Sequence, residues 1–149
     1  MPSDDVEIRP AKAEDLHRLW PLVQEFAFSY RPERPAFERS FRDLLDRPDT
    51  LLLVAVAHGG DVVGYLLGSC HGTFFANGLV AWIEELMVSE PVRRQGVASE
   101  LVYSAEEWAQ NLPAAYVALA SRRAGDFYRR IGYEESASYF RKVFVPPDR

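Results

Sequence analysis

The sequence predicts a single α/β domain in the order β-α-α-β-β-β-α-β-α-β, which is a mixed central sheet covered by helices. Two observations predict this fold class. Apolar residues switch between helical and strand spacing along the chain. The length of 149 residues is close to the usual size of one domain, and no internal repeat or linker divides it. We therefore expect residues 1–149 to form one domain.

The first third of the chain predicts a short strand and two helices. Residues 6–9 suit a strand, and apolar residues at helical spacing over 16–26 predict an amphipathic helix. Because Pro21 lacks a backbone donor, we expect it to kink that helix or to begin a new turn. Pro35 suits the first position of a second helix, which ends before Pro48. Both helices should cover a sheet.

The middle of the chain predicts three antiparallel strands. Residues 51–58 and 62–69 are apolar and rich in β-forming residues, and Gly59-Gly60-Asp61 between them is a hairpin-turn signal. A second break over 72–78 leads to a strand over 80–88.

The last third predicts helix, strand, helix and strand. Apolar spacing over 98–108 favours a helix, and residues 115–120 suit a buried strand. A short helix over 127–131 should stop at Gly132, which stands in the position of a C-terminal glycine. Residues 133–145 are long enough for one closing strand.

Composition excludes several function classes. With 17 Lys+Arg against 22 Asp+Glu, the net charge is −5, which disfavours nucleic acid as a partner. A lone Cys70 cannot form an intrachain disulfide, and the first residues lack the features of a signal peptide. The longest apolar run, residues 51–57, is too short to cross a membrane. We therefore expect a cytoplasmic protein with no nucleic-acid or membrane partner.

The most informative segment is residues 88–98, with the sequence VSEPVRRQGVA, at a strand-to-helix junction. The first amides of a helix lack internal partners and lie at its positive end, so amides around 95–98 can cradle a pyrophosphate. Gly96 and Ala98 are small enough for phosphate oxygens to approach the main chain, and Arg93 and Arg94 add charge-assisted donors. This junction is the expected anion site.

Neither G-x-G-x-x-G nor G-x-x-x-x-G-K-(S/T) occurs in the chain, so the common nucleotide motifs are not supported. The spacing Arg93-x-x-Gly96-x-Ala98 instead resembles the acyl-CoA pyrophosphate loop, (Q/R)-x-x-G-x-(G/A), of the GCN5-related N-acetyltransferase (GNAT) family. The resemblance continues upstream in residues 84–88, EELMV, and downstream in residues 127–133, FYRRIGY. With the matching order of elements, it covers nearly the whole chain.

The resemblance implies a GNAT-like fold in which two splayed parallel strands form the acyl-CoA cleft. These strands would be the one ending at Val88 and the one over 115–120. Main-chain groups near Met87 and Val88 would pair with the pantetheine. Ser121 takes the position where the family commonly has a cofactor-binding Asn, so we expect it to contact the cofactor there without the family's usual side-chain amide. The residues expected to hold the pyrophosphate are Arg93, Arg94, Gln95, Gly96, Val97 and Ala98.

The chemistry of amide formation suggests roles for three side chains. An alkylamine is unprotonated in only about one molecule in 2,500 at pH 7, so a carboxylate base, Glu84 or Glu85, can help remove its proton. Tyr128 can donate a proton to the leaving thiolate, and the backbone N–H of Met87 or Val88 can stabilise the oxyanion. Strict alternation would place the two glutamates on opposite faces unless a bulge intervenes.

The glutamate pair is similar to that of the polyamine and diamine acetyltransferases, in which the first acid acts on the amine. We therefore expect Glu84 to be the base and Glu85 to bind substrate or serve the structure. His17, His58 and His71 show no metal-ligand spacing, so no metal is expected. A lone cysteine, Cys70, favours packing over nucleophilic catalysis.

The main hypothesis is an acetyl-CoA-dependent N-acetyltransferase that passes the acetyl group directly to a small cationic amine, such as a polyamine, diamine or amino-sugar antibiotic. Three alternatives remain open. The acceptor could instead be a protein N-terminus or lysine, or the domain could bind acyl-CoA without catalysis. A nucleic-acid-binding domain would need a basic face from the arginines at 122, 123, 129 and 130. Relatives of this fold often pair, so a homodimer through the final strand is also considered.

Overall fold

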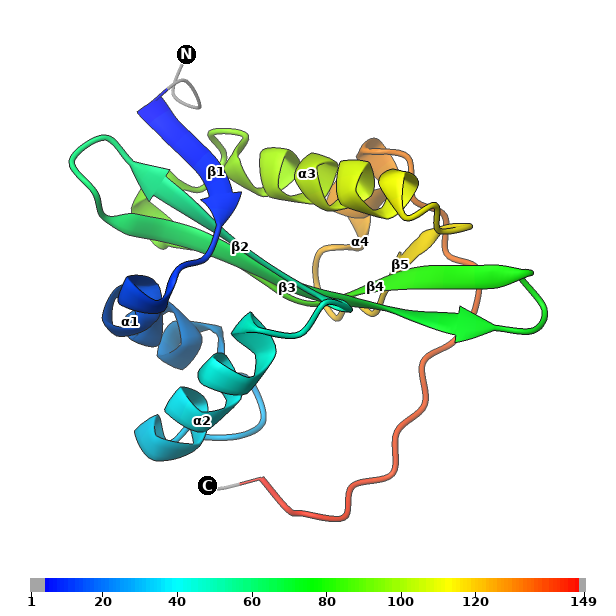
Figure 1. Ribbon diagram of the computed structural model, residues 1–149, viewed down its shortest axis with the longest axis horizontal. Helices are drawn as coiled ribbons and strands as arrows, with labels where there is room; N and C mark the ends of the chain where they lie inside the picture. The colour runs from blue at the N-terminus through cyan, green and yellow to red at the C-terminus, as the bar shows by residue number, and fades with distance from the viewer. Residues whose placement is uncertain (1–4, 148–149) are drawn as a thin grey trace.

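The computed structural model describes residues 5–147 and shows a five-stranded sheet between two layers of helices (Figure 1). The strands lie in chain order across the sheet, and every neighbouring pair is antiparallel except β4 and β5, which are parallel. Their bounds are β1 (Val6–Pro10), β2 (Thr50–Ala57), β3 (Val62–Thr73), β4 (Gly78–Val88) and β5 (Val117–Leu119).

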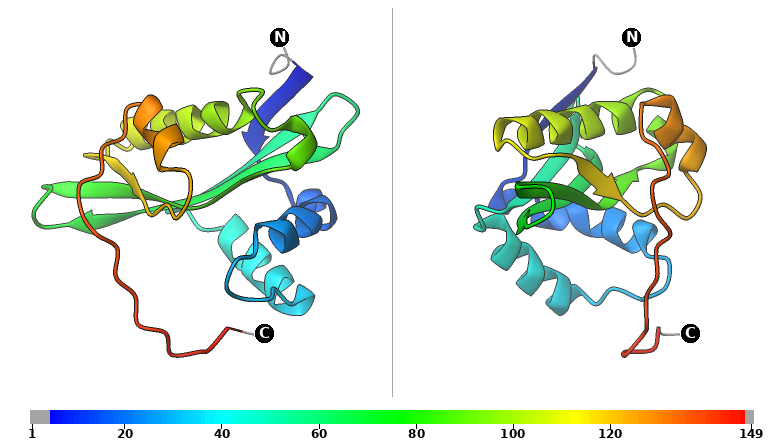
Figure 2. Two further views of the ribbon diagram at one scale, coloured as in Figure 1. Left: turned by 180° about the vertical axis from the view of Figure 1, so that it is seen from behind. Right: turned by 90° about the vertical axis from the view of Figure 1, so that its right-hand side faces the viewer.

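Four α-helices cover the sheet, α1 and α2 on one face and α3 and α4 on the other (Figure 2). They are α1 (Leu16–Phe26), α2 (Arg34–Leu45), α3 (Val97–Asn111) and α4 (Gly125–Arg130), with single 3-10 turns η2 (Ala13–Asp15) and η3 (Glu90–Val92). No helix in the described part of the chain combines the length and apolar character needed to span a bilayer.

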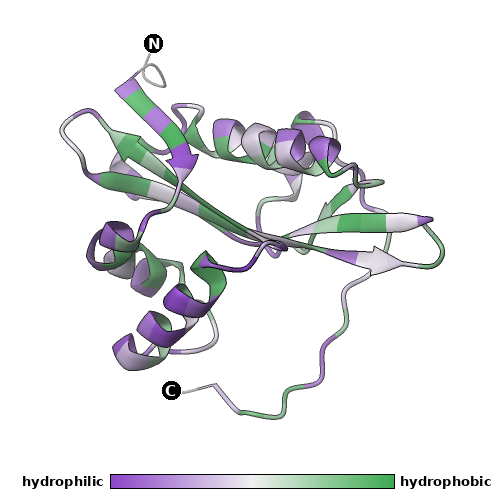
Figure 3. Ribbon diagram, in the orientation of Figure 1, coloured by the Kyte–Doolittle hydropathy of each residue, from purple (hydrophilic) through white to green (hydrophobic). Residues whose placement is uncertain are grey.

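Each face of the sheet has its own apolar core. Under α3, Leu101 and Val102 pack with Ala55 and Leu66. Beneath α1 and α2 lies a second cluster, formed by residues Leu16, Leu19, Leu22, Phe41, Val54, Val62, Tyr65 and Met87. Strand alternation explains the division, because successive strand residues point to opposite faces. The central strands therefore supply apolar residues to both faces, and their middle parts are largely green in the hydropathy colouring (Figure 3).

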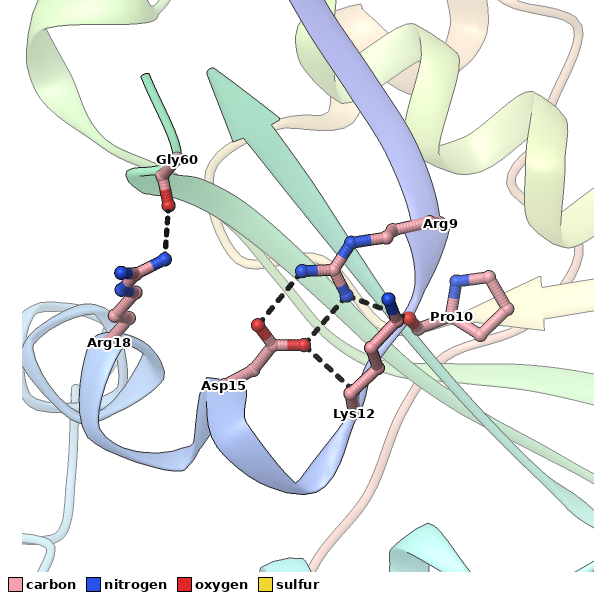
Figure 4. Close-up of polar contacts among 6 residues, drawn as sticks. All are labelled: Arg9, Pro10, Lys12, Asp15, Arg18 and Gly60. Atoms are coloured by element: carbon pink, nitrogen blue, oxygen red, sulfur yellow. Dashed lines mark hydrogen bonds and ion pairs between the residues drawn. The ribbon is translucent and has the colours of Figure 1, made fainter. Parts of the chain in front are cut away.

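An ion pair between the partly exposed Arg9 and the buried Asp15 fixes the turn from β1 to α1 (Figure 4). The Asp15 side chain accepts two hydrogen bonds from the Arg9 guanidinium, at 2.8 and 3.0 Å, and one from the Lys12 amide at 2.7 Å. The hydrogen bonds from Arg9 lower the pKa of Asp15 below its usual value despite burial. Arg18 of α1 also donates to the Gly60 carbonyl in the β2–β3 turn, at 2.7 Å. These contacts hold α1 against the sheet.

The predicted fold class, its helices and its first five strands are confirmed, with shifts at some ends. The helix α1 is continuous through Pro21, so no separate helix begins there. The strand β3 extends to Thr73, so the second break is a turn over 74–77, and β5 is shorter than expected.

The predicted closing strand over 133–145 is wrong for the single chain. Residues 134–147, here called the C-terminal arm, follow α4 as an irregular segment that passes the sheet and ends on the side of α1 and α2 (Figure 2), where the Tyr30 hydroxyl donates to the Val145 carbonyl at 2.7 Å. Among the described residues the arm makes no backbone–backbone hydrogen bond. Because strand propensity alone stabilises nothing without a neighbouring strand, the segment has no regular structure.

Candidate active site

The two parallel strands part in the middle of the molecule. Pairing between β4 and β5 covers Ala81–Ile83 and Val117–Leu119. Beyond Ile83, β4 continues to Val88 without a neighbour on that side. On that side of β4, the main-chain groups of residues 84–88 therefore have no neighbouring strand to pair with. The predicted splay of the parallel strands is present, and ligands commonly bind at such a point beyond the carboxyl ends of parallel strands.

A β-bulge places the two glutamates at this point. Opposite β4, Leu67 pairs with Glu85 and Gly68 pairs with Ile83, so Glu84 has no partner on β3. Ile83 and Leu86 both pack in the core under α3. The two residues between them, Glu84 and Glu85, are both turned away from that face. The bulge thus removes the alternation that would have separated the carboxylates.

The two carboxylates have different surroundings. Glu84 is exposed, whereas Glu85 is partly buried and accepts a hydrogen bond from the Tyr65 hydroxyl at 2.7 Å. Desolvation raises the pKa of Glu85 above its usual value, against the lowering effect of the Tyr65 hydrogen bond, and the nearby Glu84 charge raises it further. Tyr65 in turn packs edge-on against Phe26 of α1, with ring centroids 6.3 Å apart. Glu85 is thus fixed against the α1 side of the sheet.

The loop between β4 and α3 has the backbone of an anion cradle. Arg94 and Gly96 take left-handed conformations, with φ of +66° and +85°. Gly96 is the N-cap of α3 and supplies no capping side chain, and the first helical hydrogen bond runs from the Glu100 amide to its carbonyl at 3.0 Å. Within residues 5–147, the amides of 97–99 have no hydrogen-bond acceptor. They are available to an anion at the positive end of the helix.

A pocket of about 330 Å³ lies over this loop. Six of the predicted cofactor residues line it, namely Val88, Arg93, Arg94, Gly96, Val97 and Ala98. Its far wall comes from α4, through Phe127, Arg130 and Ile131. Three arginines therefore surround a pocket in a protein of net charge −5. The pocket has the shape and charge to take a pyrophosphate.

Arg130 was not among the predicted site residues. Its position could have been found from helical spacing, because Phe127, Arg130 and Ile131 lie three and four residues apart and share one face of α4. The predicted residues Met87, Gln95 and Ser121 do not line this pocket.

The Arg93 side chain also supports the loop. Its Nε donates to the Val88 carbonyl at 2.9 Å, and its Nη2 lies 3.3 Å from Glu25 Oε2 at the end of α1. Arg93 thus ties the end of β4 to the loop and to α1, in addition to lining the pocket.

Tyr128 lies in an aromatic group on α4. Its ring centroid is 5.0 Å from that of Phe127 and 5.8 Å from that of Tyr133. Burial raises the pKa of Tyr128, so its hydroxyl stays protonated at neutral pH. Ser121 accepts a hydrogen bond from the Ala124 amide at 3.0 Å, which shapes the turn into α4. The thiol of Cys70 is buried and its pKa is raised, which makes it a poor nucleophile.

Comparison with known proteins identifies the family. The model of the Acetyltransferase (GNAT) family matches residues 16–133. The chain belongs to the GNAT acetyltransferase family. Enzymes of this family use acetyl-CoA, and the protein is a GNAT N-acetyltransferase. The resemblance stated from the sequence is therefore confirmed at the level of the family.

Individual relatives agree with this assignment. The chain is 32% identical over 143 residues to an aminoalkylphosphonate N-acetyltransferase of Salmonella typhimurium, covering 92% of this chain and 90% of the relative. A transcriptional regulator from Bacillus halodurans has a similar structure, with a TM-score of 0.85, 25% identity, and coverage of 93% and 99% of the two chains. An aminoglycoside N-acetyltransferase in complex with CoA shares the fold at a TM-score of 0.81 and 19% identity, with coverage of 94% and 95%.

Proposed function

We propose that the protein transfers the acetyl group of acetyl-CoA directly to a small primary amine, with no acetylated enzyme intermediate. One observation carries the proposal, namely that β4 and β5 part beside two carboxylates that a bulge has turned to the same side. The pyrophosphate pocket begins where β4 ends, at Val88, so a cofactor held there would extend along the free edge of β4. Its thioester would then meet the acceptor near Glu84.

Glu84 is the proposed base. A protonated alkylamine cannot attack a thioester, and losing its proton at pH 7 costs about 4.6 kcal/mol for a pKa near 10.4. Glu84 is exposed, and no hydrogen-bond donor contacts its carboxylate within the described residues, so it is free to accept that proton. The Glu85 carboxylate already accepts a hydrogen bond from the Tyr65 hydroxyl, which fixes its position. A carboxylate held in this way is suited to bind the ammonium group of the acceptor before reaction.

The remaining steps need an acid and an oxyanion donor. The amine nitrogen attacks the thioester carbon, and the oxygen of the tetrahedral intermediate accepts a hydrogen bond from the amide of Met87 or Val88. Collapse of this intermediate forms the amide and expels the CoA thiolate. Tyr128 donates its hydroxyl proton to the thiolate, and the second proton that the nitrogen loses on becoming an amide passes through solvent to restore the tyrosine hydroxyl, while Glu84 releases to solvent the first proton that it took from the ammonium group. The products are the acetylated amine, CoA and one proton.

Two classes of small acceptor have support. A diamine, polyamine or amino sugar suits the paired glutamates because each added ammonium group is attracted to them. A protein N-terminus or lysine remains the alternative if no small amine is acetylated. An acceptor that carries an anionic group, such as an aminoalkylphosphonate, is the second small-molecule class, since the Salmonella typhimurium relative is an aminoalkylphosphonate N-acetyltransferase.

A specific contact favours the second class. The guanidinium groups of Arg122 and Arg123, in the loop after β5, lie 5.1 and 5.0 Å from the centre of the Phe28 ring. Within residues 5–147, neither guanidinium forms an ion pair with a carboxylate. Phe28 follows Phe26, which contacts Tyr65, the partner of Glu85. Two cations therefore lie against the segment that follows α1, two residues beyond the contact with Tyr65, and they could bind a phosphonate.

The test is an acceptor panel assayed by CoA release, with product mass measured for each active compound. The panel pairs aminoalkylphosphonates with alkylamines of equal length, and adds diamines, amino sugars and a lysine peptide. Release of CoA above background with any member, together with a product heavier by one acetyl group, supports the transferase. If no member releases CoA, the proposal fails.

A pair of variants separates the acceptor classes. Replacing both arginines, Arg122→Gln with Arg123→Gln, should lower kcat/KM about 10-fold or more for a phosphonate acceptor and leave a simple alkylamine unchanged. Arg39→Gln, on the exposed surface of α2, is the matched control. An equal effect on both acceptors would remove the role of the arginine pair but not the transferase itself.

A further inference from the structure

We propose that Arg130 of α4 binds the 3′-phosphate of CoA and makes the enzyme select CoA over dephospho-CoA, the analogue that lacks this group. The inference rests on the proposed function, because it takes the pocket to hold acetyl-CoA. It extends that function from the pyrophosphate to the adenosine end of the cofactor. The acceptor and the catalytic roles assigned above have no part in it.

The first observation is that the pocket has two walls, which come from different parts of the chain. One wall is the loop before α3, with Arg94 and Gly96, and the other is α4, with Arg130. The backbone amides of 97–99, which have no acceptor within residues 5–147, belong to the loop wall. Arg130 therefore lies across the pocket from the groups that suit the pyrophosphate, in a position to meet a second anionic group.

The second observation is the size and lining of the pocket. Its volume of about 330 Å³ lies in the range of pockets that enclose whole small molecules, so a pyrophosphate alone would not fill it. Besides the arginines, the pocket is lined by apolar side chains, among them Val92, Val97, Phe127 and Ile131. Such side chains suit the ribose and adenine of a nucleotide better than a further phosphate. The adenosine part of CoA would therefore occupy the rest of the pocket.

The third observation is the difference between two adjacent arginines at the end of α4. Arg129 donates to Asp126 at 3.1 Å and to Glu135 at 3.0 Å, so its charge is already neutralised at the surface. Arg130 is also exposed, but within the described residues its side chain forms no ion pair and no hydrogen bond. Arg130 thus keeps its full charge at the wall of the pocket.

The covalent structure of CoA connects these observations. Its ribose carries the pyrophosphate on the 5′ carbon and a phosphate on the 3′ carbon, so an adenosine between the two walls presents both anions to the pocket. The 3′-phosphate is a monoester with about two negative charges at neutral pH and three oxygens that accept hydrogen bonds. A guanidinium binds such a group through two parallel N–H donors. With the loop amides on the pyrophosphate, Arg130 is matched to the 3′-phosphate.

The first test is isothermal titration of the full-length protein with CoA and with dephospho-CoA, in the absence of an acceptor. The wild type should bind CoA about 10-fold more tightly than dephospho-CoA. Arg130→Gln should lose about 10-fold in affinity for CoA and keep the wild-type affinity for dephospho-CoA, so that the preference disappears. Arg130→Lys should recover part of the preference, because lysine keeps the charge but not the paired donors.

Two other arginines provide matched comparisons. Arg129→Gln removes the same charge one residue away, where Asp126 and Glu135 already neutralise it, and should leave both affinities unchanged. Arg94→Gln, at the loop wall, should weaken CoA and dephospho-CoA by the same factor, because both ligands carry the pyrophosphate. The contrast separates a specific contact from the general attraction of an anion to positive charge. Circular dichroism checks that each variant is folded.

The second test is a steady-state comparison of acetyl-CoA with acetyl-dephospho-CoA as the acetyl donor. Arg130→Gln should raise KM for acetyl-CoA about 10-fold and leave kcat unchanged, because the 3′-phosphate lies at the opposite end of the cofactor from the thioester. The KM for acetyl-dephospho-CoA should stay at its wild-type value. A merely structural role of Arg130 would instead lower kcat or affect both donors alike.

Three results would overturn the proposal and leave the proposed function standing. A wild type that binds CoA and dephospho-CoA equally well has no contact with the 3′-phosphate. Equal weakening of both ligands by Arg130→Gln would place the guanidinium on the pyrophosphate. Unchanged affinities in Arg130→Gln would show that the side chain contacts neither group. A wild type that binds neither ligand would remove the proposed function as well.

Discussion

The proposed pyrophosphate pocket and the proposed acceptor side of this enzyme are built by different means. Around the pocket, the candidate binding groups are backbone amides at the start of α3, which follows the left-handed Gly96. On the proposed acceptor side they are the side chains of Glu84, at a β-bulge, and Glu85, which accepts a hydrogen bond from Tyr65. A local stretch of sequence determines the first, whereas the second depends on partners far apart in the chain. The first is therefore visible in full as a motif, whereas for the second the sequence shows the glutamate pair but neither the bulge nor the contact with Tyr65.

The largest expected effect would test whether the acceptor side is catalytic. Glu84→Gln should lower kcat about 100-fold or more while leaving the affinity for CoA unchanged, since it removes the base but touches no pocket residue. The deficit should shrink as the pH approaches the pKa of the amine, because the acceptor then loses its proton unaided. Rate profiles from neutral to alkaline pH measure this. Glu90→Gln, an exposed acid in η3, is the control; an equal loss there would contradict the assignment.

The next effect would test the backbone cradle. Gly96→Asp should raise the dissociation constant of CoA about 100-fold, because it combines a strained backbone with a negative charge beside the pyrophosphate. Gly59→Asp is matched to it, since Gly59 also has positive φ, at +106°, with open space around it. Isothermal titration compares the two. If both variants bind CoA as the wild type does, the cradle is not at this loop.

A smaller effect should come from the proposed acid. Tyr128→Phe should lower kcat about 10- to 100-fold with CoA binding retained, because the ring keeps its contacts with Phe127 and Tyr133. The control is Tyr133→Phe, which removes a hydrogen bond to Glu106 of 2.8 Å and should reduce stability rather than kcat. Steady-state rates and thermal melts separate these outcomes. An unchanged kcat in Tyr128→Phe would assign the proton to another donor.

The smallest effect concerns stability on the acceptor side. Because the pKa of Glu85 is raised in the folded protein, the folded state binds more protons than the unfolded state above pH 4.5. The free energy of unfolding should therefore fall as the pH rises from 4.5 through the folded pKa. Glu85→Gln should lack this fall and melt about 2–4 °C higher at pH 7.5, the shift produced by ~1 kcal/mol in a domain of this size.

Tyr65→Phe provides the opposite control for that prediction. Loss of the hydroxyl removes the one hydrogen bond that favours the charged form of Glu85, so this variant should melt lower than the wild type at pH 7.5. Thermal melts of all three proteins from pH 4 to 8 measure the trend. If the Glu85→Gln protein is less stable than the wild type at every pH, burial does not destabilise the charged carboxylate in the folded protein.

The sequence was sufficient for what depends on neighbouring residues. Helical spacing located α1 and α3, the hairpin turn at Gly59 located β2 and β3, and the spacing from Arg93 to Ala98 located the pocket loop. Each of these signals arises within a few turns or a single strand pair. The glycine that ends a helix is also a local signal, and Gly132, with φ of +100°, was therefore correctly placed after α4.

What depends on distant partners could not be derived. The bulge at Glu84 comes from its pairing with β3, and the Tyr65–Glu85 hydrogen bond joins residues twenty apart. Both β-propensity and length favoured a strand in the C-terminal arm, but a strand also needs a neighbour to pair with, and the described residues of the arm pair with no strand in this structure. The predicted roles of Glu84, Tyr128 and Ser121 remain predictions.

The contact between Arg93 and Glu25 links the two regions compared above. One guanidinium lines the pyrophosphate pocket and also holds the end of α1, next to the segment that carries Phe28. An anion in the pocket therefore competes with Glu25 for that group, so the two substrates should bind with a thermodynamic coupling that is equal in both directions. The ion pair is about half exposed and is worth at most ~1 kcal/mol, so the coupling should not exceed about fivefold. Acceptor affinities measured without CoA will differ from those of the ternary complex by up to that factor.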